Sequence, residues 1–267
     1  MNTLLSLNRV SKTFTPRIEA IRDVSLEVKE NEFICILGPT GCGKSTLLRL
    51  IAGLEQPSSG IISLNGQTIK GPGSDRGMVF QKYTSFPWLT VEENVAFGLK
   101  SQGVPHDERR GTVEHLLKEV GLWDFRHAYP STLSGGMQQR VALARTLAVN
   151  PRVLLLDEPL GALDAQTRSE MQLLLLSIFM NSKHTILFVT HDIEEALFLG
   201  QRLIVSGPRP FEVRHDMAIP FSYPRPSDLR TSTPFANLEQ QVTMLLRRLI
   251  LEARTNDPSL CESSRSA

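Results

Sequence analysis

The feature that most constrains this chain is the segment GPTGCGKS at residues 38–45. It follows a run of apolar residues, Phe33 to Leu37, and precedes a helical run, Thr46 to Ala52, that stops at Gly53. Glycines at such a turn let backbone N–H groups point inward around an anion, and the N-terminus of the next helix adds a partial positive charge. The segment therefore predicts a strand, a phosphate-binding loop and a helix in an α/β fold.

Each residue of the loop has an expected role toward a nucleotide. Lys44 would reach the β and γ phosphates, Ser45 would offer its hydroxyl to a Mg²⁺ ion, and Thr46 would touch the α phosphate. The alternative is a glycine-rich turn that binds nothing, and the strand and helix on either side argue against it. The remaining loop residues would surround the phosphates with their backbone, Cys42 being a tolerated small residue: Gly38, Pro39, Thr40, Gly41, Cys42 and Gly43.

Two kinds of strand pattern divide the chain. The alternating segments LLSLNRV, VSLEV and IISLNG in the first sixty or so residues are typical of an antiparallel lobe with an exposed face. Three runs are apolar nearly throughout, as strands covered by helices on both faces must be: 33–37, 153–156 and 185–189. These runs predict a parallel sheet.

The rest of the chain predicts an inserted helical lobe and a separate C-terminal element. A stretch from about Lys82 to Asn150 reads as helical, with Thr90 as one helix cap. Prolines 208, 210, 220, 224 and 226 are expected to break any regular element, and an amphipathic helix follows over 238–253, then an irregular tail. The predicted organisation is one domain over 1–230, with a helical subdomain at about 82–150, and a C-terminal helix and flexible tail over 231–267.

Composition excludes several classes of protein. A formal net charge of +1 over 267 residues gives no electrostatic footprint for a nucleic-acid partner, and none is expected. Cys35, Cys42 and Cys261 are too few and too irregularly spaced for a disulfide framework or a zinc site. The start lacks the pattern of a signal peptide, and the longest apolar stretch, 173–180, falls far short of the ~20 residues that cross a bilayer.

Polar residues follow three of the predicted strands. Asp157 and Glu158 end the run VLLLDEP, where Pro159 prevents the ladder from continuing, so they should emerge at the carboxyl edge of the sheet. Asp157 is suited to helping bind Mg²⁺, and Glu158 is suited to polarising the attacking water near a γ phosphate. A solvated Asp-Glu cap is the structural alternative.

Gln81 and His191 end two further runs, RGMVFQ and ILFVTH. Gln81 could contact Mg²⁺ or the attacking water, and His191 could hydrogen-bond the γ phosphate through its neutral imidazole. Each is alternatively an ordinary polar residue at a strand end.

Taken together, GPTGCGKS, Gln81, LSGGM at 133–137, LLLDEP, GALD at 161–164 and the final TH resemble, in order and spacing, the nucleotide-binding subunit of ATP-binding cassette (ABC) transporters. The resemblance covers roughly residues 5 to 220. It implies an α/β fold: a P-loop NTPase core of parallel strands, an antiparallel β lobe and an inserted helical lobe. It also implies an ATPase with ATP and Mg²⁺ as cofactors.

The resemblance explains the second glycine-rich segment, LSGGM at 133–137, which corresponds to the signature motif of the family. In the family two ATPase subunits pack head to tail, as a homodimer or with a like subunit, and the signature of one closes over the ATP held by the other. Ser134, Gly135 and Gly136, at the start of a helix, would then face a γ phosphate from the opposite side. Phe14 sits where the family places an aromatic residue that stacks on adenine, usually Tyr, and a core position is its alternative. Met137 departs from the commoner Gln.

Within the family, PWLTVEENVAFGL, LSGGM and GPRP are most similar to importers of the nitrate, sulfonate and taurine type. The implied partners are integral membrane permease subunits and, indirectly, a periplasmic or lipid-anchored solute-binding protein, with the chain on the cytoplasmic face of the inner or plasma membrane. The segment SFPWLT reads either as core of the helical lobe or as the surface that receives the permease. Gln201 stands where an Asp is usual.

The sequence lacks the features of two other classes of nucleotide-binding protein. A non-transport ABC-type ATPase would predict a long coiled-coil insertion or two cassettes per chain, and the sequence has neither. A P-loop GTPase would need an N-K-x-D guanine reader, which this sequence lacks. The preferred reading is an ATPase subunit that powers uptake of a small solute.

Overall fold

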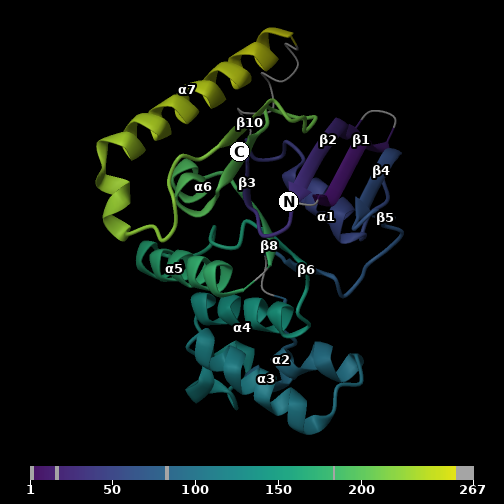
Figure 1. Ribbon diagram of the computed structural model, residues 1–267, viewed down its shortest axis with the longest axis vertical. Coiled ribbons are helices and arrows are strands. Elements are labelled where there is room, and N and C mark those ends of the chain that lie inside the picture. The colour runs from purple at the N-terminus through teal and green to yellow at the C-terminus, as the bar shows by residue number, and fades with distance from the viewer. Residues whose placement is uncertain (1–2, 16–17, 82–83, 183, 257–267) are drawn as a thin grey trace. The chain divides into compact units, whose positions relative to one another are not determined.

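A computed structural model describes residues 3–15, 18–81, 84–182 and 184–256. The chain divides into two compact units, Met1–Gly71 with Phe188–Ala267, and Pro72–Leu187 (Figure 1). The strand β8 has residues in both, because the second unit ends inside it. The predicted helical subdomain at about 82–150 falls in the second unit. Of the tail expected over 254–267, residues 254–256 are helical, and 257–267, with Cys261, lie outside the described residues.

The first unit contains an antiparallel sheet in the order β2-β1-β4-β5. Alternation of buried and exposed side chains along β2 gives this sheet one covered face, as its sequence pattern predicts. Helix α1, Lys44–Ala52, packs against β2 (Figure 1). The strands are β1 Thr3–Thr15, β2 Ile18–Lys29, β4 Ser59–Leu64 and β5 Gln67–Thr68.

The same unit holds one side of a mixed sheet, in the order β10-β9-β3-β8. Every residue of β3, Phe33–Leu37, and of β8, Thr185–Thr190, is buried, which confirms the prediction from their apolar runs. Strand β3 pairs parallel with β9, Arg202–Val205, and β9 pairs antiparallel with β10, His215–Ala218. The expectation of no regular element among the late prolines is wrong for β10, which fits between Pro210 and Pro220.

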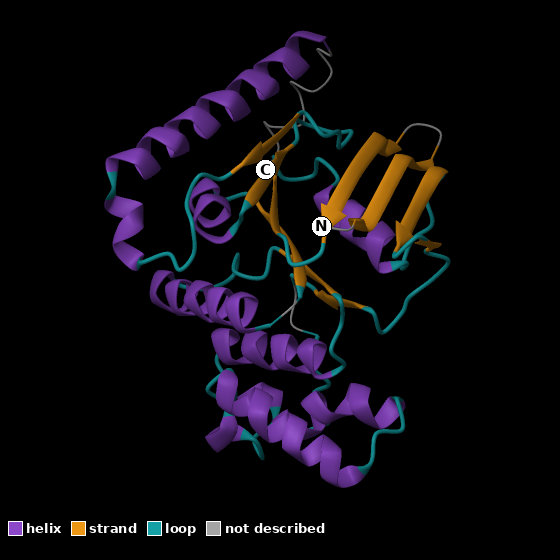
Figure 2. Cartoon of the chain, viewed as in Figure 1, coloured by secondary structure: helices purple, strands orange, loops and turns teal. Residues whose placement is uncertain are grey.

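The second unit combines the order β8-β7-β6 with a group of helices (Figure 2). Strand β6, Arg76–Val79, pairs parallel with β7, Val153–Asp157, whose residues are all buried. The helices are α2 Val91–Ser101, α3 His106–Glu119, α4 Gly135–Ala148 and α5 Ala165–Asn181, with short 3-10 turns at Trp123–Phe125 and Pro130–Thr132. The two strand patterns and the helical stretch together confirm the predicted fold class.

Helix α2 begins as its sequence predicts. The Thr90 hydroxyl accepts a hydrogen bond from the backbone N–H of Glu93, and the Glu93 carboxylate accepts one from the N–H of Thr90. This reciprocal capping satisfies donors that a helix N-terminus otherwise leaves unpaired. The hydrogen bond from the backbone of Thr90 lowers the pKa of Glu93.

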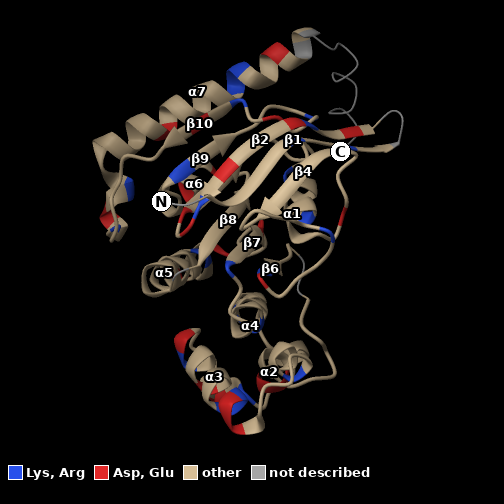
Figure 3. Ribbon diagram, turned by 45° about the vertical axis from the view of Figure 1, so that its right-hand side comes forward, with Lys and Arg blue, Asp and Glu red and all other residues tan. Residues whose placement is uncertain are grey.

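Helix α3 carries both acidic and basic residues (Figure 3). Its Lys118 and Glu114 form an ion pair of 2.7 Å one turn apart.

In the part of the chain that the structure describes, no helix has the length and apolar character needed to span a bilayer.

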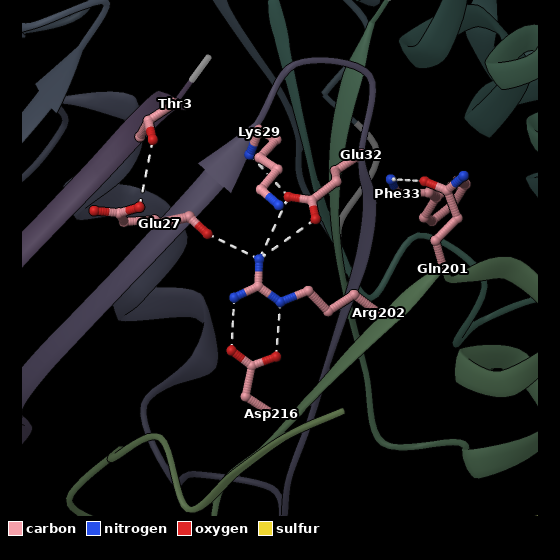
Figure 4. A network of polar contacts seen from close by, with 8 residues as sticks. All are labelled: Thr3, Glu27, Lys29, Glu32, Phe33, Gln201, Arg202 and Asp216. Carbon is pink, nitrogen blue, oxygen red and sulfur yellow. Dashed lines mark hydrogen bonds and ion pairs between the residues drawn. The ribbon is translucent and has the colours of Figure 1, made fainter. Parts of the chain in front are cut away.

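A polar network around Arg202 joins β9, β10 and β2 in the first unit (Figure 4). The guanidinium binds both carboxylate oxygens of Asp216, at 2.7 and 2.6 Å, and donates to the carbonyl of Glu27 at 2.8 Å. Next to it, the Gln201 side-chain oxygen accepts from the N–H of Phe33 at 3.1 Å. Gln201 therefore binds the backbone at the start of β3 through its amide oxygen.

The C-terminal part of the first unit consists of a 3-10 turn, η3, at Ser227–Thr231, and helix α7, Thr233–Asn256. Helix α7 is longer at both ends than the predicted 238–253. Pro234 in its first turn explains the early start, because proline is tolerated where the N–H has no helical partner. A short helix, α6, Ile193–Leu199, packs against α7.

Candidate active site

The predicted phosphate-binding loop runs from the end of β3 into α1. Gly43 is the residue before the helix, with φ 122°, and Gly41 has φ 79°. Both angles lie where a side chain is disfavoured. Lys44, Ser45 and Thr46 form the first turn of α1, and the N–H groups of a first turn lie outside the hydrogen-bond ladder of the helix itself. This arrangement fits the phosphates of a nucleotide.

Gly43 cannot be replaced without moving β2. A Cβ at this residue would lie 2.4 Å from the carbonyl oxygen of Ala20 and 2.9 Å from the Cβ of Phe211. The carbonyl of Ala20 already accepts the N–H of Phe211 at 2.9 Å. The antiparallel sheet therefore presses directly on the end of the loop, and only glycine fits there.

The Lys44 side chain is 4 % exposed and lies along the loop. Its ammonium donates to the carbonyl of Gly38 at 2.8 Å and to that of Pro39 at 3.0 Å. A positive charge held over the first residues of the loop is well placed to meet anionic oxygens that enter it.

Cys42 is buried, and burial raises the pKa of its thiol. A Cβ at Gly38 would lie 3.0 Å from the Cys42 sulfur. The side chain therefore fills space under the loop in its protonated form, in agreement with its reading as a tolerated small residue.

Phe14 lies on β1 with 47 % of its surface exposed, so the alternative of a core position is wrong. Its neighbours Thr13 and Thr15 pair with Glu19 and Ile18 on β2, next to Ala20. Phe14 is therefore close along the strand pair to the residue that presses on Gly43. An exposed ring beside the phosphate loop can offer a face to an adenine base.

His191 directly follows β8 and is exposed. The residues on either side of it are both fixed by Glu195 of α6. Thr190 donates to the Glu195 carboxylate at 2.8 Å, and the Asp192 carboxylate accepts the Glu195 N–H at 3.0 Å. The histidine thus sits on a bend with two anchored neighbours.

In the second unit, the structure brings Gln81 and Glu158 together. The parallel register pairs Val79 with Leu156, so the residues that follow both strands emerge at the same edge. The Gln81 side-chain nitrogen donates to the Glu158 carboxylate at 3.4 Å. Asp157, the last residue of β7, is 4 % exposed at this edge.

Glu158 has φ 44°, a left-handed conformation that costs a non-glycine residue free energy. Its carbonyl accepts the N–H of Gly161 at 3.3 Å, which closes a turn after the strand. The turn directs a carboxylate out of the sheet edge instead of along the strand. Nothing in the local sequence pattern predicted this conformation.

The glycine-rich signature opens α4. Ser134 caps the helix by accepting the N–H of Met137 at 3.3 Å. Ser134 is exposed and Gly135 half-buried, so both are accessible at the positive end of the helix, whereas Gly136 is buried.

Gly136 is packed against the N-terminus of α5. A Cβ at Gly136 would lie 2.3 Å from the Thr167 Cγ2. The Thr167 hydroxyl donates to the Asp164 carboxylate at 2.7 Å, and this bond lowers the pKa of Asp164, the residue that caps α5. The signature and the segment Gly161–Asp164 thus form one packed block, with Thr167 as a member that the sequence motifs did not reveal.

An aromatic platform, Phe86, Trp88 and Phe97, follows Gln81 in the same unit. The ring of Phe86 lies 5.5 Å from that of Trp88 and 4.6 Å from that of Phe97. Trp88 is 69 % exposed, so the interpretation of this residue as core of the helical lobe is wrong.

Two residues that sequence reasoning missed shape this platform. Asn94 is fully buried, accepts the N–H of Phe86 at 2.8 Å and donates to the carbonyls of Phe86, Leu89 and Thr90. Arg145 of α4 donates to the carbonyl of Thr84 at 2.7 Å and lies 5.1 Å from the Phe86 ring. Burial lowers the pKa of the Arg145 guanidinium.

Comparison with known proteins identifies the family. Residues 21–161 match the family model described as "ABC transporter". The chain belongs to the ABC transporter family. It is 50 % identical over 216 residues to the nitrate import ATP-binding protein NrtD of Synechocystis, covering 81 % of each chain. It is also 50 % identical over 224 residues to the taurine import ATP-binding protein TauB of Roseobacter denitrificans, covering 82 % of this chain and 84 % of the relative.

A solved ABC cassette has the same fold. It is a dimer in a post-hydrolysis state bound to ADP and Pi, 34 % identical, with a TM-score of 0.72 over 82 % of this chain and all of the solved one. The ABC protein described here is accordingly an ATPase, and the prediction from its motifs is confirmed for family, fold and activity. The roles of individual site residues stay predictions.

We expect Gly136→Ala to lower the melting temperature of the ABC protein, because its new methyl group overpacks against Thr167 by roughly 1–3 kcal/mol. Thr167→Ser removes the opposing methyl group and keeps the hydroxyl that binds Asp164, so the double variant should recover most of the loss. Thermal unfolding of the wild type, both single variants and the double variant measures this. A double variant no more stable than Gly136→Ala would contradict the contact.

Proposed function

We propose that this ABC ATPase binds and hydrolyses ATP to power import of a small anionic or zwitterionic solute of the nitrate, sulfonate or taurine kind through separate membrane subunits. The observation that carries the catalytic part is the Gln81–Glu158 contact at the carboxyl edge of β6 and β7. The 50 % identity to nitrate and taurine import proteins supports the transport part.

Each unit offers its own groups to the proposed reaction. In the first, the backbone of the loop and the Lys44 ammonium bind the phosphates, and the exposed Phe14 ring supports adenine. In the second, the Glu158 carboxylate polarises the attacking water by accepting its proton, while the Gln81 amide orients the same water. His191 donates a hydrogen bond to the γ phosphate as its charge rearranges.

Magnesium fits the donors that this chain offers. The Ser45 hydroxyl, the Asp157 carboxylate and the Gln81 amide oxygen are oxygen ligands of the kind Mg²⁺ prefers, and one carboxylate with phosphates is its usual environment. When bound, the ion neutralises charge on the β and γ phosphates. Asp157 is buried at the end of β7, so the strand holds this carboxylate in a fixed position.

The exposed signature supports a dimer with shared sites. Ser134 and Gly135 lie at the N-terminus of α4, which attracts anionic groups. In a head-to-tail pair, this end of one subunit would close on the nucleotide bound to the loop of the other. The dimeric state of the related cassette with ADP and Pi supports this pairing.

The aromatic platform supports a membrane partner. Trp88 and Phe97 expose large apolar surface next to the loop that carries Gln81, and Asn94 and Arg145 hold that surface in shape. A permease helix that docks here would lie next to the loop that leads from Gln81, and its movement could be transmitted to the Gln81–Glu158 contact. We infer that the ATPase works on the cytoplasmic face of a membrane, and that a solute-binding protein supplies the permease from the other side.

Glu158→Gln should leave ATP affinity unchanged and slow hydrolysis by the roughly 10²- to 10⁴-fold typical of a lost general base. The amide keeps the size of the side chain but cannot accept the proton. Calorimetric titration with ATP and phosphate release under single-turnover conditions measure the two quantities. Normal turnover in the purified variant would remove Glu158 from the mechanism.

Trp88→Glu should abolish association with the proposed permease subunits, because it places a charge on the platform. The variant should bind ATP and melt as the wild type does, since Trp88 is exposed. Leu173→Glu, a change at a similarly exposed apolar residue on α5, is the matched control and should associate normally. Co-purification of the permease with Trp88→Glu at wild-type levels would refute docking at this surface.

Mixed dimers test whether each ATP is shared between two chains. A Lys44→Ala chain paired with a Ser134→Arg chain keeps one intact site if the signature acts on the partner's loop, because the other site then carries both lesions. If each chain used its own signature, every site would carry one lesion. Single-turnover hydrolysis in defined mixed dimers should therefore exceed that of either variant homodimer. Activity equal to the homodimers would show that both glycine-rich segments serve one chain's site.

A further inference from the structure

The short helix α6 begins two residues after His191 and depends on the rest of the first unit for its stability. It has only seven residues, Ile193–Leu199, whereas isolated helices of fewer than about 12 residues are marginal in water. Five of the seven are buried. Whatever holds this helix therefore also sets the backbone that leads into it from His191.

The last four carbonyl groups of α6 have partners that come mostly from one distant segment. The carbonyl of Ala196 accepts the N–H of Gly200 at 3.0 Å. The carbonyls of Leu197 and Phe198 accept from the Arg225 guanidinium at 2.9 and 2.7 Å, and that of Leu199 accepts from the Tyr223 hydroxyl. A helix C-terminus normally leaves these acceptors unsatisfied.

Arg225 is unusual because it is almost entirely buried. It is 4 % exposed, and burial lowers the pKa of its guanidinium. Besides α6, it donates to the carbonyl of Phe221 at 3.2 and 2.7 Å and lies 4.4 Å from the Tyr223 ring. A cation is costly to bury, so the negative end of the helix dipole and these carbonyls together must offset its desolvation.

The other end of α6 is bonded to both neighbours of His191. Glu195 is 5 % exposed, and its carboxylate accepts a hydrogen bond from the Thr190 hydroxyl. The oxygen of the same hydroxyl accepts the N–H of Asp192 at 3.0 Å. Asp192 caps the helix through the N–H of Glu195. A shift or rotation of α6 would therefore carry Thr190 and Asp192 with it.

We propose that Arg225, assisted by Tyr223, is a positioning residue for His191. It holds the C-terminal end of α6, and α6 fixes the bend that presents the imidazole. The inference rests on the proposed role of His191 at the γ phosphate. Because α6 spans only about 10 Å at 1.5 Å per residue, fraying at its last turn reaches the Glu195 hydrogen bonds one turn earlier.

A double-mutant cycle tests the proposal. Arg225→Met keeps much of the side-chain volume and removes the hydrogen bonds to Leu197 and Phe198. We expect single-turnover ATP hydrolysis to fall roughly tenfold or more, since a misplacement of about 1 Å can cost up to ~10²-fold, with ATP affinity by calorimetry unchanged. In a His191→Ala background, Arg225→Met should cause no further loss of hydrolysis.

Conservative variants and a control separate positioning from stability. Arg225→Lys keeps the charge at the helix end and should recover part of the hydrolysis lost in Arg225→Met. Tyr223→Phe removes only the hydroxyl that binds Leu199, and should show a smaller loss that also vanishes in the His191→Ala background. Arg202→Lys breaks a comparable guanidinium network elsewhere in the first unit, and should lower the melting temperature without slowing hydrolysis.

The outcomes distinguish the inference from the function on which it rests. Equal losses from Arg225→Met with and without His191 would show a purely structural role and overturn the inference. Normal hydrolysis in His191→Ala would refute the role of the histidine, and the inference would fall with it. If Arg225→Met does not fold, Arg225→Lys and Tyr223→Phe complete the cycle, and additive losses in them overturn the inference in the same way.

Discussion

The contact between Gly43 and the carbonyl of Ala20 is the constraint on which the nucleotide site depends. A Cβ at Gly43 would lie 2.4 Å from that oxygen, so the loop can close only over a residue without a side chain. The same closure aligns the first turn of α1, with Lys44, Ser45 and Thr46, toward the loop. It also brings the Phe14 region of the antiparallel sheet beside the loop. One steric limit thus connects the loop proposed to bind phosphates with the strand pair that carries Phe14.

The second unit positions its chemistry by a different rule, which is parallel register. Because Val79 pairs with Leu156, the residues that follow β6 and β7 emerge together, and Gln81 meets Glu158 without any dedicated element. The helices add a second level of order. Gly136 packs on Thr167, and Thr167 binds the Asp164 that caps α5. A substitution in the signature would therefore disturb the packing of the segment Gly161–Asp164 through Thr167.

Much of this could be predicted from sequence because the relevant signals are local. Runs of apolar residues predict strands β3, β7 and β8, and glycines between a strand and a helix predict the phosphate loop. The cap at Thr90 needs only residues 90–93. Strand β10 was missed because its residues are mostly exposed and lack a regular pattern, its place depending on pairing with β9.

The residues that sequence reasoning missed act on backbone groups far along the chain. Arg145 binds the carbonyl of a residue 61 positions away, and Arg225 binds carbonyls 27 and 28 positions away. Such bonds create no periodicity and no motif, because any carbonyl in the right place will serve. The left-handed backbone of Glu158 belongs to the same class, since a glutamate does not prefer it and only the turn after β7 requires it.

That backbone conformation has a consequence for how such proteins diverge. Glycine adopts φ 44° without the cost of order 1 kcal/mol that glutamate bears, so losing the Glu158 carboxylate to glycine would relieve strain in the fold. With the role proposed for Glu158 in hydrolysis, stability and turnover oppose each other at this one residue. A paired subunit whose own site has become dispensable can drift toward an inactive form with no penalty in folding. Asymmetric pairs, with one hydrolysing and one merely nucleotide-binding partner, are then an accessible outcome for a chain built in this way.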